Sequence, residues 1–169
     1  MAGQLMSAVM AGARNIIADI TPDFEPSTTF YEASMRLPLE RTPFSTPRQG
    51  TRAFHVVSGI MGGFGGPETG SFNAGELHHL GDVIVVRVRY HCPYSADGYG
   101  RLNNFVSTDA QRIYQALAYA NEAAWGGEAG HPSTIDLIGS SQPVPVTDGE
   151  ENEAWIVNMP FKIQTFLSE

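Results

Sequence analysis

The residues best suited to metal chemistry in this sequence are its histidines and its single cysteine. Glu76, His78 and His79 lie close together, and His91 and Cys92 end a strand-like stretch that follows. Imidazoles and thiolates bind zinc, so a zinc site that joins a loop to a strand end is one interpretation. The spacing matches no zinc pattern, and adjacent histidines on an extended chain point to opposite sides, so exposed or interface histidines are the other interpretation. We expect neither a metal nor a cofactor.

Covalent and acid–base catalysis have no signature in this sequence. There is no Gly-x-Ser-x-Gly elbow, and His91 beside Cys92 is adjacency in sequence rather than a catalytic dyad. Cys92 is interpreted as a small buried hydrophobic residue at a strand end. Two acids can meet in space for glycoside chemistry, but Glu150, Glu151 and Glu153 share a predicted turn, where solvated carboxylates are expected. We expect a protein that is not an enzyme.

Two arginines on one face of a predicted strand are more informative. In residues 82–92 the side chains alternate with a period of two, which predicts a central strand with one core face. The core set is Ile84, Val86, Val88 and Tyr90, and the second set is Val85, Arg87, Arg89 and His91. Two guanidinium groups on one face repel each other unless anions lie opposite. This second face is therefore either open to solvent or paired with carboxylates of a neighbouring subunit.

Two amphipathic helices are predicted to pack on the sheet that contains this strand. Apolar side chains recur at helical spacing through residues 5–20, although Gly12 is expected to weaken that helix. Thr108 and Gln111 form a capping box, which predicts that a second helix begins there and spans residues 108–125.

Further strands are predicted at residues 52–60, with Phe54 inward, and at residues 155–167, where Pro160 indicates an edge or a bulge. Residues 135–146 are predicted to hold a strand or a strand pair. The chain is thus predicted to be a single domain, 1–169, of the α+β class. Two helices pack on a mainly antiparallel sheet of about four strands, in the order α-β-β-α-β-β.

Two long segments, 22–50 and 61–81, interrupt this pattern as extended loops. Residues 22–50 combine prolines with large apolar side chains, so we expect an arm that covers either its own sheet edge or a neighbouring subunit. The glycines of residues 62–66 lack the Lys-Ser/Thr of a phosphate-binding loop. Phe64 and Phe72, on a predicted hairpin tip, are expected to contact another chain.

Composition excludes several classes of protein. The formal net charge is −8, which argues against a protein that binds nucleic acid by neutralising phosphates and suits a surface that DNA passes without sticking. One cysteine permits no internal disulfide framework. We expect no signal peptide and no membrane span, because no apolar run approaches the roughly 20 residues that a span needs.

The order of these elements resembles that of the tail terminator proteins of long-tailed bacteriophages. The resemblance spans most of the chain and rests on the predicted helices and strands at residues 5–20, 52–60, 82–92, 108–125 and 155–167. It implies a homohexameric ring in the virion neck, assembled in the host cytoplasm, that caps the tail tube and docks to the head connector. Genomic DNA would pass through its lumen without specific binding.

If the resemblance holds, the contact residues assigned to the ring are Phe64, Phe72, Arg87, Arg89 and His91. One alternative is a head-closure or connector protein of the same neck. Another, from a different class, is a small α+β enzyme or a ligand- or metal-binding protein that uses His78, His79 and His91.

Overall fold

The computed structural model describes residues 2–20, 29–32, 51–58, 78–92, 94–147 and 153–167. The helices are α1 (Ala2–Ala18), α2 (Ala96–Tyr119) and the short 3-10 helix η2 (Glu128–Gly130). The strands are β1 (Thr29–Glu32), β2 (Thr51–Ser58), β3 (His78–Tyr90), β4 (Thr134–Leu137), β5 (Val144–Thr147) and β6 (Glu153–Leu167). The predicted α+β class is confirmed, although the described sheet has six strands instead of about four.

The sheet is built around β3 and β6. Its order is β1-β2-β3-β6-β4, and β5 pairs with β6 as well. All pairs are antiparallel except β1 with β2. The β3–β6 ladder runs from His78 opposite Leu167 to Tyr90 opposite Trp155, whereas β2 reaches β3 only as far as Ile84. Residues 78–83 therefore pair with β6 alone among the described strands.

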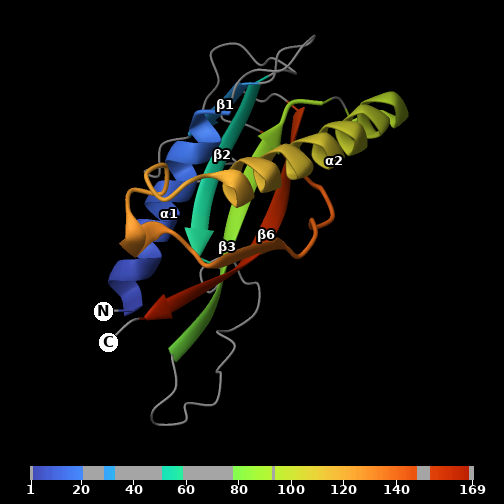
Figure 1. Ribbon diagram of the computed structural model, residues 1–169. Helices are drawn as coiled ribbons and strands as arrows, with labels where there is room; N and C mark the ends of the chain where they lie inside the picture. The colour runs from blue at the N-terminus through green and yellow to red at the C-terminus, as the bar shows by residue number, and fades with distance from the viewer. Residues whose placement is uncertain are drawn as a thin grey trace.

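Both long helices lie on one face of the sheet (Figure 1). In that view α1 lies along the β1–β2 side and α2 lies across the sheet. The predicted core set of β3 is confirmed, since Ile84, Val86, Val88 and Tyr90 are all 0% exposed. They pack in one cluster with Val9, Ala13 and Ile17 of α1, Leu102, Ile113 and Leu117 of α2, and Val157, Met159, Phe161 and Ile163 of β6.

The helix predicted at residues 5–20 is confirmed as α1, and Gly12 has a packing role that propensity did not reveal. A Cβ atom on Gly12 would lie 2.8 Å from both Cε3 and the carbonyl oxygen of Trp125. Gly130 in η2 approaches the same carbonyl oxygen, from which a Cβ on Gly130 would lie at 2.4 Å. Glycine thus lets α1 and η2 close around the buried Trp125.

The second helix begins a full three turns before the predicted site. Ser95 is its N-cap, and the Ser95 hydroxyl accepts a hydrogen bond of 3.1 Å from the Gly98 backbone N–H. Thr108 lies within α2 and caps nothing, so the predicted start is wrong. The reason is that the buried stripe of α2 extends upstream through Val106 and Leu102 to Gly98, and tertiary packing outweighs a local capping pattern. The helix also ends earlier than predicted, at Tyr119.

Residues 135–146 were predicted to hold a strand or a strand pair, and the pair is found as β4 and β5, both beside β6 on the side away from β3. Pro160 lies on β6 between the residues that these two strands cover. There the loop between them contacts β6 directly, since Ile138 N–H donates to the Pro160 carbonyl at 3.0 Å and Ser141 N–H to the Asn158 carbonyl at 2.8 Å. β6 is not an edge strand, since it pairs with β3 on one side and with β4 and β5 on the other, but the missing N–H of Pro160 falls where β4 and β5 separate.

The predicted loops are only partly described. Four residues of segment 22–50 form β1 and extend the chain's own sheet, which is the first of the two alternatives for that arm. In segment 61–81, residues 78–81 belong to β3, and the rest lies outside the described residues. In the described ranges no helix is long and apolar enough to cross a membrane.

Candidate functional site

The predicted contact residues are not all accessible. Phe64 and Phe72 lie outside the described residues, and Arg87, Arg89 and His91 lie on or just after β3, on the face away from the helices. Arg87 is half-buried, but Arg89 is 0% exposed and His91 is 6% exposed. The expected open face is therefore wrong at Arg89 and His91, and both are unavailable as surface contacts in this conformation.

Arg89 lies between buried apolar neighbours in the sheet. Its cross-strand neighbours are Ala53 on β2 and Ile156 on β6, which are themselves only 1% and 3% exposed and pack with Val146 of β5. Strand alternation predicted on which face Arg89 lies, but alternation carries no information about how deeply that face is covered.

Arg87 has a polar partner within the chain. Its Nε donates to Asn158 Oδ1 at 3.2 Å, across the β3–β6 ladder. The Arg87 guanidinium thus has a neutral amide oxygen of its own chain as an acceptor. The sequence analysis had left this position either to solvent or to carboxylates of a neighbouring subunit. Contact between Arg87 and another subunit stays a prediction.

The histidine cluster is not formed. His78 and His79 begin β3 and pair with Leu167 and Phe166, whereas His91 follows its last residue. Twelve residues of extended strand separate His79 from His91, which corresponds to about 40 Å. One metal or ligand site that uses both His79 and His91 is therefore excluded, because the two ends of β3 are too far apart. No group of three potential metal ligands occurs among the described side chains.

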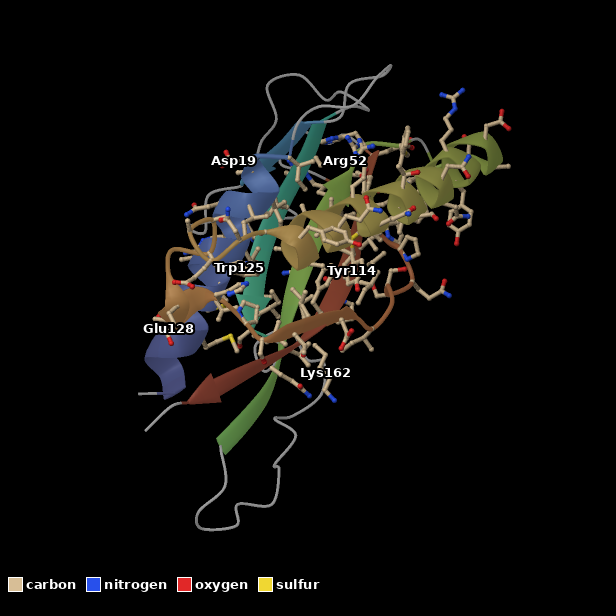
Figure 2. The ribbon with its side chains drawn as sticks, in the orientation of Figure 1. Asp19, Arg52, Tyr114, Trp125, Glu128 and Lys162 are labelled. Carbon is tan, nitrogen blue, oxygen red and sulfur yellow. The ribbon has the colours of Figure 1, made fainter. Side chains whose placement is uncertain are left out.

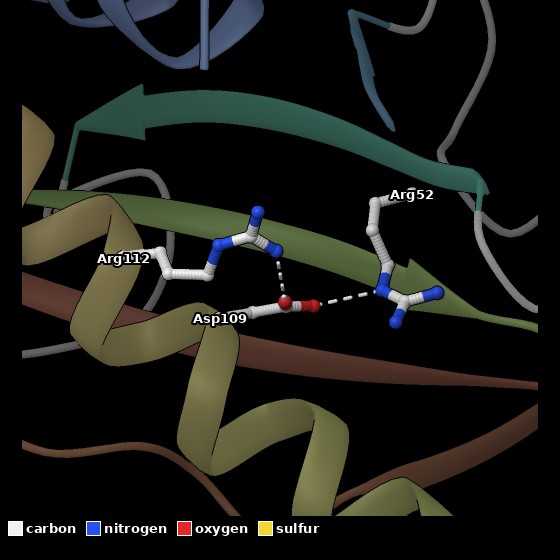
Figure 3. Close-up of polar contacts among 3 residues, drawn as sticks. All are labelled: Arg52, Asp109 and Arg112. Atoms are coloured by element: carbon white, nitrogen blue, oxygen red, sulfur yellow. Dashed lines mark hydrogen bonds and ion pairs between the residues drawn. The ribbon is translucent and has the colours of Figure 1, made fainter. Parts of the chain in front are cut away.

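A buried charge cluster lies between α2 and the sheet instead (Figure 3). Arg52 Nε donates to Asp109 Oδ2 at 2.7 Å, and the two side chains are 1% and 2% exposed. Arg112, one turn further along α2, places Nη1 3.7 Å from Asp109 Oδ1. Two cations from two elements thus share one carboxylate in the core.

Aromatic rings enclose this cluster. The Arg52 Cζ atom lies 4.8 Å from the ring centroid of Tyr90 and 4.5 Å from that of Phe105, within the range of cation–π attraction. Burial raises the pKa of the Tyr90 phenol well above its ordinary 10.0; the Asp109 carboxylate raises it further, and the Arg52 charge partly opposes the rise. Burial likewise raises the pKa of the Cys92 thiol from 9.0, and nearby Arg52 again opposes the rise. The predicted buried role of Cys92 is confirmed by its 1% exposure.

The burial of this cluster determines what it can do. Side chains that are 1% and 2% exposed are closed to a substrate, so this ion pair has a structural role. It joins Asp109 of α2 to Arg52 of β2 and thereby fixes the position of the helix on the sheet. The sequence analysis missed it, although a signal was present. Arg52 has the same strand parity as the core residue Phe54, and Asp109 lies in the apolar stripe of α2 between Val106 and Ile113. A basic and an acidic residue, each on a core face, are typical of a buried pair.

A second, accessible cluster joins the start of α2 to the β5–β6 hairpin. The rings of Tyr94 and Tyr99 lie 5.2 and 5.8 Å from that of Trp155, both edge to face, and the tyrosines are 43% and 40% exposed. Trp155 Nε1 donates to the Cys92 carbonyl at 3.1 Å, and the Tyr94 hydroxyl donates to the Val146 carbonyl. Exposed, rigidly held aromatic rings are typical of contact surfaces between proteins.

Comparison with known proteins gives no family. No protein-family model and no curated protein matches the chain. The geometry therefore has to be interpreted by itself. Among the described residues, two features are suited to contacts between proteins: the exposed rings of Tyr94 and Tyr99, and the β3–β6 ribbon, in which residues 78–83 of β3 pair with β6 alone.

Proposed function

We propose that this chain is a ring-forming structural subunit, a tail terminator that caps the tail tube of a long-tailed bacteriophage and docks to the head connector. The observation that supports this most is the β3–β6 ribbon. Residues 78–83 of β3 pair with β6 alone among the described strands, so their opposite edge faces away from β6. A strand edge of this kind is a template for pairing with another chain.

The direction of the backbone groups on that edge follows from β6. The carbonyls of Asn158 and Pro160 and the N–H of Asn158 bond to the loop between β4 and β5, so the even-numbered groups of β6 point away from β3. In an antiparallel ladder the odd-numbered groups of β6 then point toward the even-numbered residues of β3. The N–H of Gly81 is consequently directed away from β6, toward the side where a neighbouring subunit would add.

Charge supports the remaining parts of the proposal. A net charge of −8 disfavours adhesion to DNA, as the lumen of a ring through which a genome passes requires. Location in the virion neck and assembly in the host cytoplasm belong to the same proposal. A head-closure role in the same neck is the alternative, and it differs in the partner bound, the portal side instead of the tail tube.

The first test is the mass of the purified protein in solution. Six copies of the 18.3-kDa chain give about 110 kDa by sedimentation or native mass spectrometry. Electron micrographs should then show rings at the ends of tail tubes, and binding to portal complexes alone would favour head closure. A protein that stays at one copy at high concentration contradicts the ring.

Edge variants test how the ring closes. Gly81→Pro removes the outward N–H, and Gly81→Lys adds a charge to the edge, so both are expected to reduce the mass to that of one chain. Ser107→Lys makes the same charge change at an exposed position in the middle of α2 and should leave the ring intact. Circular dichroism checks that each variant is folded. A ring that persists in both folded Gly81 variants excludes this edge as the contact.

A further inference from the structure

A hollow of about 700 Å³ lies where α2 ends, and it is lined by none of the residues of the buried charge cluster or of the β3–β6 ribbon. Its apolar walls are formed by Leu117, Ala118, Ala120, Trp125, Pro132 and Ile135, and its polar lining by Glu128, His131, Ser133 and Thr134. Figure 2 shows Trp125 and Glu128 on the turn that follows α2. The volume lies within the range of roughly 300–1,000 Å³ that is usual for binding sites.

The hollow has a negative electrostatic character from two sources. Glu128 contributes an exposed carboxylate, and α2 directs its C-terminal end at the hollow with no basic residue in its last turn. Backbone carbonyls at a helix C-terminus carry the negative end of the helix dipole, which favours a cation nearby. The apolar walls would accommodate the aliphatic stem of the same side chain.

The distribution of charge along the chain agrees with a cationic occupant. Residues 113–161 contain no lysine or arginine, but they contain the acids Glu122, Glu128, Asp136, Asp148, Glu150, Glu151 and Glu153. Among the described lysines and arginines, Arg101 is exposed and the others are buried or half-buried; Arg101 lies near the start of α2. The 17 residues from Arg101 to Ala118 span about 25 Å of helix. A basic group and an acidic hollow thus lie at opposite ends of one rigid element.

We propose that this hollow is a socket for a basic side chain, and that in the assembly it takes Arg101 from a neighbouring copy of this chain. A contact between opposite ends of α2 is head-to-tail, and repeated head-to-tail contacts generate rings. The occupant rests on the proposed ring function, whereas the preference of the socket for cations is a property of the single chain. The two are therefore tested separately.

The socket is tested on the isolated protein with n-butylguanidinium, which carries the charge and the stem of an arginine side chain. Titration at millimolar concentration should shift the nuclear magnetic resonance signals of the Trp125 indole and the Ala118 and Ile135 amides, and pentanol and pentanoate should shift them less. Glu128→Gln should weaken binding roughly two- to fivefold, the range for an exposed ion pair. Glu122→Gln, a matched change outside the hollow, should leave it unchanged. Equal binding by wild type and Glu128→Gln, or no localised shifts, overturns the socket.

The occupant is tested by charge reversal. Arg101→Glu and Glu128→Lys should each reduce the fraction of protein in the ring, and the double variant should restore it; Glu122→Lys is the control. Rings that form equally in both single variants overturn the assignment of Arg101. A monomeric wild type would contradict the proposed ring and the Arg101 contact together, and the butylguanidinium titration would still support or overturn the socket.

Discussion

Removing the charge of Asp109 is expected to destabilise this protein more than any exposed acidic substitution. Asp109→Asn keeps the shape of the side chain but leaves Arg52, which is 1% exposed and donates to Asp109 at 2.7 Å, without its carboxylate. Breaking a buried pair by removing one partner costs about 3–5 kcal/mol. Single domains have a free energy of unfolding of about 5–15 kcal/mol, so a large share of the stability is lost.

Urea unfolding followed by circular dichroism measures this loss. The midpoint should fall while the slope stays constant, because the surface exposed on unfolding is unchanged. Asp97→Asn is the matched control, an exposed acid in the first turn of the same helix, where loss of the dipole interaction costs about 0.3–1 kcal/mol. The double variant Arg52→Met with Asp109→Leu removes both charges and should lose less than the sum of its single variants. An Asp109→Asn variant no less stable than Asp97→Asn would refute the assignment of a buried pair.

Two further predictions concern the same core. The unfolded chain releases the Tyr90 proton near pH 10.0 and the folded chain retains it to higher pH, so Tyr90 contributes stability below pH 10 that is lost as pH rises, by about 1.4 kcal/mol per pH unit. Urea midpoints from pH 9 to 11 should therefore fall more steeply for wild type than for Tyr90→Phe, and parallel curves would contradict this. Gly12→Ala should destabilise by about 1–3 kcal/mol through overpacking against Trp125. Gly100→Ala, with open space around it, should instead stabilise α2 by up to about 1 kcal/mol; a stabilised Gly12→Ala would exclude the close approach.

Periodicity predicted the parts of the fold whose faces are set by neighbouring residues. The helical spacing in residues 5–20 and the alternation on β3 predict one core face for each element, and Val9, Ile17, Val86 and Val88 are buried on those faces. These assignments succeed because one apolar face per element is enough to determine which side packs inward.

The remaining features depend on residues far apart in the chain. Arg52 and Asp109 are 57 residues apart, and nothing local shows that they meet. The start of α2 was misplaced because the Thr108 capping pattern is local, whereas the stripe from Gly98 to Leu117 is stabilised by the sheet beneath it. Arg89 was assigned to the correct face, but its burial depends on the elements that cover that face.

The position of β6 in the sheet also bears on how the protein is made. This strand pairs with β3, β4 and β5, and it leaves the ribosome after all three of them. Until it emerges, β4 and β5 lack their partner strand and β3 lacks one of its two neighbours. Folding of the sheet therefore waits until β6 has emerged, and closing such long loops is slow. Chains cut short before residue 153 should be recognised by chaperones and proteases as unfinished.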